Sequence, residues 1–139
     1  MIRVDRITVD DVGRVLAAAA LFDRPPRDAA LHAFLADPAT FLLLASVDDA
    51  PAGFARGVRL RRPDTERPQL FLYEIGVAES RRRLGVGSAL IRGVLAIARE
   101  QRCLEVFVLA DPANEPALAL YRSTGGVAET SLMYVYDLR

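Results

Sequence analysis

The sequence predicts an α/β domain built around a mixed β-sheet, and three observations support this prediction. Between residues 69 and 110, an apolar run of strand length is followed by a glycine-containing loop, an amphipathic helical pattern and a second apolar run. Two strands joined through a helix run parallel in a right-handed crossover. Ahead of this unit, two apolar runs separated by a turn sequence predict an antiparallel hairpin. The composition, 52% hydrophobic and 26% charged, is that of a compact globular protein.

The segment ahead of the hairpin predicts one strand and two helices. Residues 1–7 alternate in the manner of an edge strand, and Thr8 with Asp11 forms the capping-box pattern that begins a helix. Asp28 is a candidate cap for the second helix, which ends before Pro38 because proline does not continue a helix.

The hairpin and the strand after it form the most apolar part of the sequence. Residues 40–47 and about 52–60 are its two strands, and the polar residues 61–68 predict an exposed loop. Residues 69–77 predict a strand whose odd-numbered and even-numbered side chains lie on opposite faces. Glu74 is the misfit in this run, because burying a carboxylate without a partner is costly.

The second half of the chain adds two helices and two strands. Residues 87–102 have the apolar stripe of a helix, and residues 104–110 predict a buried strand. Residues 116–125 begin with proline and end with glycine, which suits a helix, and residues 130–138 predict a last strand that closes the sheet. We expect residues 1–139 to form a single domain.

Charge and composition exclude several classes of function. Eighteen basic residues, all arginine, balance eighteen acidic ones, and this neutrality argues against nucleic-acid binding. The one cysteine, Cys103, excludes an internal disulfide and suits a reducing compartment. No segment has the roughly 18 uncharged apolar residues of a spanning helix, and residues 1–10 do not resemble a signal peptide. We therefore expect a soluble cytoplasmic protein that binds neither nucleic acid nor membranes.

Residues 81–88, RRRLGVGS, predict an anion-binding loop. Gly85 and Gly87 let the backbone approach a ligand closely, and the helix that follows presents free amides and the positive end of its dipole. A pyrophosphate is expected to bind the amides of residues 83–88, with added charge from residues 81–83. Alternatively, the two glycines only permit a tight turn.

Other ligand classes fail on specific residues. The dinucleotide-binding fingerprint needs a third glycine where Leu90 stands, and the Walker motif needs a lysine that the loop does not have. One histidine, His32, and one cysteine, Cys103, are too few for a zinc site, and no metal is expected. Cys103 is interpreted as a small core residue rather than a nucleophile.

Two ordered motifs resemble the signatures of the GNAT superfamily of N-acetyltransferases. Arg82-x-x-Gly85-x-Gly87 matches the family's Q/R-x-x-G-x-G/A pyrophosphate loop. The resemblance covers residues 1–139 and implies the GNAT fold, a mixed sheet of about 6–7 strands flanked by about 4 helices, with the acetyl-CoA unit at residues 69–110. The second signature is matched downstream by Asn114-x-x-Ala117-x-x-Leu120-Tyr121-x-x-x-Gly125.

The resemblance implies acetyl-CoA as the cofactor and assigns residues to it. In the family, the central strand separates from its neighbour, pantetheine pairs with its exposed backbone, and a free amide polarises the acetyl carbonyl. Asn114 either bonds the pantetheine or caps a helix. The predicted acetyl-CoA-binding residues are Ile75, Val77, Arg82, Arg83, Leu84, Gly85, Val86, Gly87, Ser88 and Asn114.

Two side chains are candidates for catalysis. Amide formation requires a neutral amine, so a base must remove a proton, and Glu74 is the candidate for this role or for orienting the amine. Alternatively, Glu74 reaches water or pairs with an arginine. Tyr121 matches the family's tyrosine that protonates the leaving thiolate, and its alternative role is packing on an apolar helix face.

The resemblance is strongest to the gentamicin-type aminoglycoside 3-N-acetyltransferases, in FLYEIGVAESRRRLGVGSALI, DPANEPALALY and MYVYDLR. It implies an antibiotic-resistance enzyme whose small-molecule amine substrate is rimmed by carboxylates. Acetylation of a polyamine, amino acid or peptide amine, or a non-catalytic acetyl-CoA-binding module, are the alternatives. The candidate rim residues are Asp23, Asp28, Asp111, Glu129 and Asp137.

The chain departs from the family at its end. Gly126 stands where the family usually has an aromatic residue, and the segment after Gly125 is too short for two full strands. A second subunit is therefore expected to complete the sheet edge, which makes the protein a homodimer by hypothesis.

Overall fold

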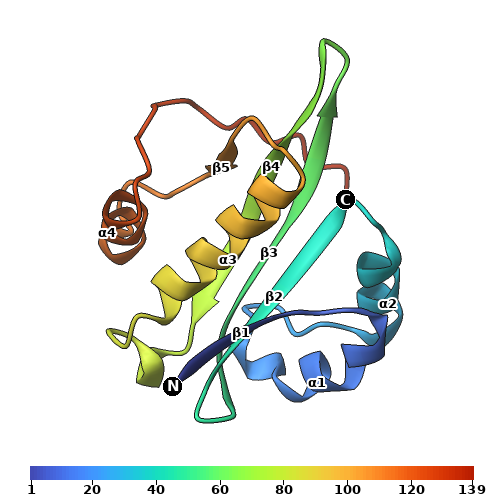
Figure 1. Ribbon diagram of the computed structural model, residues 1–139, viewed down its shortest axis with the longest axis vertical. Helices are drawn as coiled ribbons and strands as arrows, with labels where there is room; N and C mark the ends of the chain where they lie inside the picture. Colours follow the sequence, from blue (N-terminus) through green and yellow to red (C-terminus); the bar gives the residue numbers. More distant parts are fainter. The chain divides into compact units, whose positions relative to one another are not determined.

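The computed structural model describes residues 1–139, which divide into two compact units, Met1–Leu109 and Ala110–Arg139. The first unit contains a five-stranded sheet of order β1-β2-β3-β4-β5, shown in Figure 1. Its strands are β1 (Ile2–Arg6), β2 (Thr40–Val47), β3 (Ala50–Arg62), β4 (Thr65–Val77) and β5 (Val106–Val108). Its helices are α1 (Val12–Ala17), α2 (Asp28–Ala36) and α3 (Val86–Glu100), with short 3-10 turns η1 (Val9–Asp11), η2 (Ala19–Leu21) and η3 (Glu79–Arg81).

The mixed character of the sheet confirms the predicted fold class. The first four strands pair antiparallel in sequence order, whereas β4 and β5 pair parallel across the crossover through α3. The sheet has five strands rather than the expected 6–7. No helix of the chain combines the length and the apolarity needed to cross a bilayer. The single domain over residues 1–139 stays a prediction.

Strand β2 is the centre of the core because helices cover both of its faces. Leu42 and Leu44 belong to the cluster that α1 and α2 form with Phe54 of β3. Leu43 points to the opposite face, where a Cβ atom on Gly93 of α3 would lie 2.9 Å from its side chain. A strand covered on both faces is apolar throughout, which explains why β2 is buried from position 41 to 47.

The predicted helix starts are confirmed in one case and shifted in the other. The Thr8 hydroxyl accepts a hydrogen bond from the Asp10 amide at 3.3 Å, and the Asp11 carboxylate accepts one from the Thr8 amide at 2.9 Å. The N-cap of α2 is Arg27, not Asp28, and no side chain caps this helix. Asp28 instead begins the helix and lies 3.3 Å from His32.

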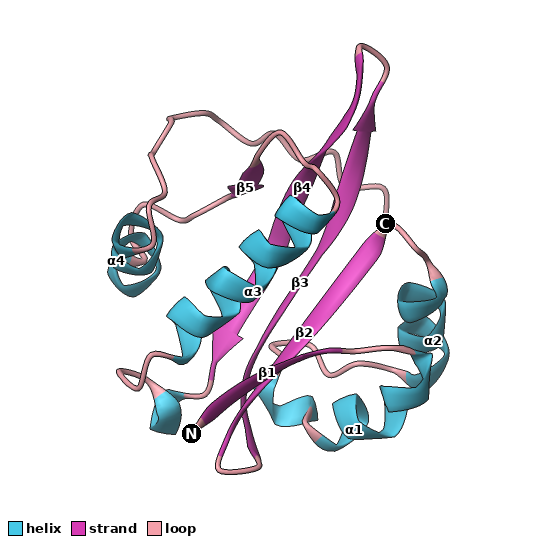
Figure 2. Ribbon diagram, in the orientation of Figure 1, coloured by secondary structure: helices cyan, strands magenta, loops and turns pink.

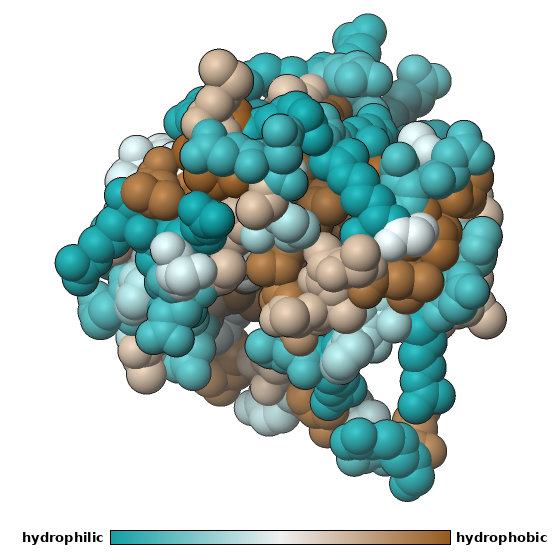
Figure 3. All heavy atoms as spheres, turned by 90° about the horizontal axis from the view of Figure 1, so that it is seen from below, coloured by the Kyte–Doolittle hydropathy of each residue, from teal (hydrophilic) through white to brown (hydrophobic).

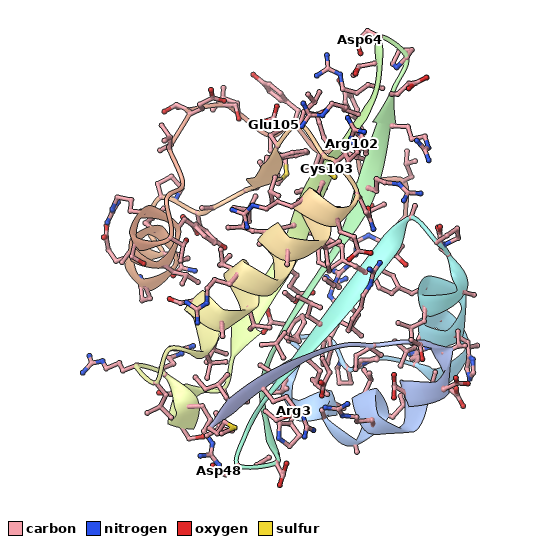
Figure 4. The ribbon with its side chains drawn as sticks, viewed as in Figure 1. Arg3, Asp48, Asp64, Arg102, Cys103 and Glu105 are labelled. Atoms are coloured by element: carbon pink, nitrogen blue, oxygen red, sulfur yellow. The ribbon has the colours of Figure 1, made fainter.

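The predicted loop at residues 61–68 is wrong, because β3 and β4 continue as a hairpin until Arg62 pairs with Thr65. Asp64 lies at the tip of the hairpin in Figure 4 and accepts two hydrogen bonds from Arg62, at 2.9 and 2.7 Å. Polar residues in this stretch indicate exposure on both faces of the hairpin, and exposure does not prevent backbone pairing.

The second unit contains one helix, α4 (Glu115–Ser123), which ends at two glycines. Gly125 has a φ of 98°, and the Gly126 amide donates to the Tyr121 carbonyl at 2.8 Å. This is the Schellman arrangement, and a Cβ atom at position 126 would lie 2.9 Å from that same carbonyl oxygen. Glycine in place of the family's usual aromatic residue therefore fits this helix end.

Of the two strands predicted after α3, one is shorter than predicted and the other is absent. The strand predicted at residues 104–110 is confined to β5, and residues 130–138 have no regular secondary structure, as the loop colouring in Figure 2 shows. A strand requires a hydrogen-bonded partner, and the second unit contains no other strand. The side chains of this segment are accordingly exposed, with Tyr136 at 87%.

Gly57 of β3 offers a test of the sheet packing. A Cβ atom there would lie 1.9 Å from the Phe71 carbonyl oxygen and 2.6 Å from the Phe41 ring, so Gly57→Ala forces the backbone apart. We expect it to lower the free energy of unfolding by about 1–3 kcal/mol in chemical denaturation. Gly13→Ala is the control, since no atom lies within 4 Å of its Cβ position in α1. Equal losses in both variants would contradict this account.

Candidate acetyl-group donor and acceptor sites

The loop that precedes α3 presents a row of free main-chain amides. Arg82 donates to Glu79 and Ala89 donates to Gly85, whereas the amides of residues 83–88 donate to no protein acceptor. Residues 82–85 are exposed. Figure 3 views the molecule from the end at which this loop lies, and hydrophilic and apolar atoms are interspersed over that face. The loop therefore offers donors at the positive end of the α3 dipole.

Backbone conformation in this loop turns those amides inward. Arg83 and Gly85 have φ values of 66° and 88°, in the left-handed region, and Gly85 is the N-cap of α3. A left-handed residue followed by a right-handed one, as in Gly85 and Val86, makes an anion-binding concavity of successive amides. Arg81, Arg82 and Arg83 lie at the start of this loop, and none of them forms an ion pair with a carboxylate. This arrangement fits a diphosphate.

The remaining loop residues contribute mainly through their backbone. The side chain of Val86 is buried at 1% exposure, so only its amide faces a ligand. Leu84 is 51% exposed, and Gly87 and Ser88 occupy the first turn of α3. These placements are compatible with the predicted main-chain binding of a phosphate.

A β-bulge in β4 reverses the direction of its backbone groups. The amide of Leu70 donates to Glu105 beside β5, whereas the amide of Ala78 donates to Ala52 of β3. Without interruption, residues 70 and 78 would face the same neighbour, because backbone groups alternate with a period of two. The pairing register shifts by one residue at Tyr73, and the predicted strict alternation of faces over residues 69–77 is therefore wrong.

The bulge leaves a free backbone edge beyond it. Because Ala78 faces β3, Ile75 and Val77 direct their amide and carbonyl groups to the side of β5. Pairing with β5 ends at Leu72 and Val108, so no strand occupies this edge. An extended ligand can add to such an edge by backbone hydrogen bonds. The contacts of Ile75 and Val77 with pantetheine stay a prediction, with which this free edge is compatible.

Glu74 lies in a pocket on the α2 side of β4. One carboxylate oxygen, Oε1, accepts a hydrogen bond from Arg56 Nε at 2.7 Å, and the Arg56 guanidinium stacks 4.4 Å from the Tyr73 ring centre. The alternative of pairing with an arginine is therefore realised, and the other oxygen has no protein partner. The pocket measures about 520 Å³ and is lined by Phe22, Asp23, Arg24, Pro26, Arg27, Ala30, Leu31, Phe34, Leu42, Arg56, Tyr73 and Glu74.

The pocket lacks the carboxylate rim that the sequence predicts. Of the five candidate acids, Asp23 alone lines it, while Asp111, Glu129 and Asp137 belong to the second unit. Arg24 and Arg27 line the pocket instead. Sequence reasoning missed these two arginines, although the motif RPPR at residues 24–27 places them in one short loop before a helix.

Two predicted residues lie in the second unit. The Asn114 side chain accepts a hydrogen bond from the Ala117 amide at 3.2 Å, so it acts as the N-cap of α4. Tyr121 is half-buried, and this burial raises the pKa of its phenol above the usual value. A phenol with a raised pKa keeps its proton at neutral pH, as an acid must.

Two other titratable groups do not join either site. Burial raises the pKa of the Cys103 thiol, which disfavours the reactive thiolate. His32 is exposed and lies beside Asp28 on the surface of α2. No cluster of three or more His, Cys, Asp or Glu side chains has the arrangement of a metal site.

Comparison with known proteins identifies the family. Residues 9–125 match the model of the acetyltransferase (GNAT) family. Mycothiol acetyltransferase of Clavibacter sepedonicus is 36% identical over 86 residues, which cover 62% of this chain and 26% of that protein.

Two crystal structures resemble the whole chain. An aminoglycoside acetyltransferase from an uncultured soil metagenomic sample superposes with a TM-score of 0.88 at 26% identity, covering 100% of this chain and 99% of the other. The ribosomal-protein-alanine N-acetyltransferase of Brucella melitensis gives a TM-score of 0.78 at 25% identity, with 99% and 100% covered.

The chain spans about half or less of the length of the curated relatives that it matches. The family match nevertheless covers both the free β4 edge and the amide loop. It confirms the prediction of an acetyl-CoA-dependent acetyltransferase at the level of the family. The chain belongs to the GNAT acetyltransferase family, whose members use acetyl-CoA.

Proposed function

We propose that this protein is an N-acetyltransferase that transfers the acetyl group of acetyl-CoA to a primary amine of a small molecule in the pocket beside Glu74. The observation that carries the proposal is the bulge at Tyr73, which frees the backbone of Ile75 and Val77. The same strand carries Glu74 into the pocket. One strand thus serves the donor and the acceptor.

The donor is bound mainly by backbone groups. Acetyl-CoA supplies an acetyl thioester, an activated acyl group. The amides of residues 83–88 hold the diphosphate, and the free edge at Ile75 and Val77 pairs with pantetheine. A free amide of this edge polarises the acetyl carbonyl, since a preorganised donor stabilises the charge that develops on that oxygen.

Glu74 and Tyr121 handle the protons. The unpartnered oxygen of Glu74 faces the acceptor and orients the amine, whose proton it takes directly or through water. Arg56 fixes the other oxygen and so fixes the direction of the carboxylate. Tyr121 gives a proton to the departing thiolate, since a tyrosine phenol is protonated at neutral pH.

The acceptor is the less determined side of the reaction. Similarity to an aminoglycoside acetyltransferase supports an aminoglycoside as acceptor. The 3-amino group and a role in antibiotic resistance rest on the sequence resemblance alone. Similarity to a ribosomal-protein-alanine acetyltransferase supports a peptide or amino acid amine. The arginines of the pocket favour the second group of acceptors over a polycation. The proposed location is the cytoplasm.

We also propose that the protein is a homodimer in which residues 130–138 extend the sheet of a second copy. Tyr134, Tyr136 and Leu138 are exposed at 80%, 87% and 95%, and residues 132–136 form a continuous apolar run rich in strand-forming Tyr and Val. Exposed apolar strand-forming segments tend to pair with other chains.

Gly85→Ala tests the amide loop. The substitution forces an alanine to adopt a φ of 88° or to close the concavity, and we expect the Kd of coenzyme A to rise about tenfold or more in calorimetry. Gly125→Ala is the matched control, because it strains a φ of 98° in the second unit without touching this loop. An unchanged Kd of coenzyme A in Gly85→Ala would show that this loop does not bind the diphosphate.

Glu74→Gln and Tyr121→Phe test the proton transfers. We expect each to lower kcat by roughly 10²-fold or more in a thiol-release assay, since positioned acids and bases contribute about 10² to 10⁴. Neither change alters the amide loop or the free β4 edge, so the Kd of coenzyme A should change little. Full activity in either variant would show that the substituted residue does not transfer a proton in the reaction.

Sedimentation or light scattering tests the dimer. The expected mass is twice the 15.2 kDa of the chain, and removal of residues 130–139 should give a monomer. A full-length monomer at micromolar concentration would refute the proposed pairing.

A further inference from the structure

The acceptor pocket contains more positive than negative charge. Three arginines, Arg24, Arg27 and Arg56, and two acids, Asp23 and Glu74, line the pocket. Arg56 and Glu74 neutralise each other through their 2.7 Å hydrogen bond. The pocket then has one unpaired acid, Asp23, and two unpaired arginines, Arg24 and Arg27, all in the segment between η2 and α2.

Arg24 and Arg27 have no partner of their own. Neither guanidinium lies within 4 Å of a carboxylate oxygen, although nine ion pairs form elsewhere in the chain. Arg27 is also the N-cap of α2, and no side chain caps the first turn of that helix. The positive end of the α2 dipole therefore adds to the charge of the two arginines.

Most of the other lining residues are apolar. Phe22, Leu31 and Phe34 contribute to the pocket and pack in the core formed by α1 and α2. An apolar group of a ligand would therefore be removed from water here. The pocket combines three features: a carboxylate oxygen at Glu74, an apolar wall, and two unpaired guanidiniums.

These features discriminate between acceptors. A polycationic aminoglycoside would bring several positive charges to two unpaired arginines, and this repulsion is unfavourable. A carboxylate instead forms charge-assisted and often bidentate hydrogen bonds with a guanidinium. The second oxygen of Glu74, which accepts no hydrogen bond from the protein, can accept one from an ammonium group.

We propose that the acceptor is an amino-acid-like amine with an apolar body, whose carboxylate binds Arg24 and Arg27 while its amine lies at Glu74. This inference rests on the proposed N-acetyltransferase activity and names its substrate class. Arg24 and Arg27 are substrate-binding residues that select for the anionic group. The aminoglycoside acceptor is then disfavoured by charge.

The test compares matched amines with and without a carboxylate. L-Phenylalanine and L-leucine are assayed against 2-phenylethylamine, 3-methylbutylamine and the aminoglycoside sisomicin by thiol release from acetyl-CoA. We expect kcat/KM to be on the order of 10- to 100-fold higher for the amino acids than for their decarboxylated counterparts.

The double variant Arg24→Ala/Arg27→Ala isolates the cause. It should lower kcat/KM for L-phenylalanine by about 10- to 100-fold. The kcat/KM for 2-phenylethylamine should change little, and the Kd of coenzyme A should stay the same. Arg61→Ala, an exposed arginine of the β3–β4 hairpin, is the control. Circular dichroism verifies that each variant is folded.

The outcomes separate the two levels of the proposal. Preference for sisomicin or for the decarboxylated amines would overturn the inference and leave the transferase activity intact. Equal loss for L-phenylalanine and 2-phenylethylamine in the double variant would also overturn it. Thiol release with none of the amines would count against the proposed function itself.

Discussion

The bulge at Tyr73 in β4 is the constraint on which the candidate site depends. One extra residue turns the backbone groups of Ile75 and Val77 away from β3, and β5 ends before it reaches them. A backbone edge left unpaired in a protein interior is costly unless water or a ligand satisfies it. In the proposed function, acetyl-CoA is the ligand of that edge, and the free amides of the loop before α3 are its second anchor.

The sequence predicts the backbone geometry of the loop before α3 because the signals for it are local. Gly85 and the start of α3 lie within a few residues of each other, and both the left-handed φ and the free amides follow from that short segment. The parallel crossover at residues 69–110 follows from apolar periodicity in the same way. The bulge is not predictable from the run at residues 69–77, because nothing in an apolar strand marks where one residue is inserted.

The acceptor side and the chain end depend on non-local contacts, which a sequence pattern does not contain. Glu74 and Arg56 lie eighteen positions apart in the sequence and pair across two neighbouring strands. Either residue alone suggests only a buried charge. Arg24 and Arg27 become relevant only when the loop before α2 meets β4 in the pocket. Residues 130–138 contain a continuous apolar run of strand length, but a strand also requires a hydrogen-bonded partner, and the pattern alone does not supply one.

The most direct test of this account is a titration of the isotopically labelled protein with coenzyme A, followed by amide NMR. The account predicts saturable shifts in the amide resonances of Ile75, Val77 and residues 83–88, because these backbone donors are free before the ligand binds. The amide of Ala78, already bonded to Ala52, should change little. Absence of binding, or shifts confined to other parts of the chain, would contradict it.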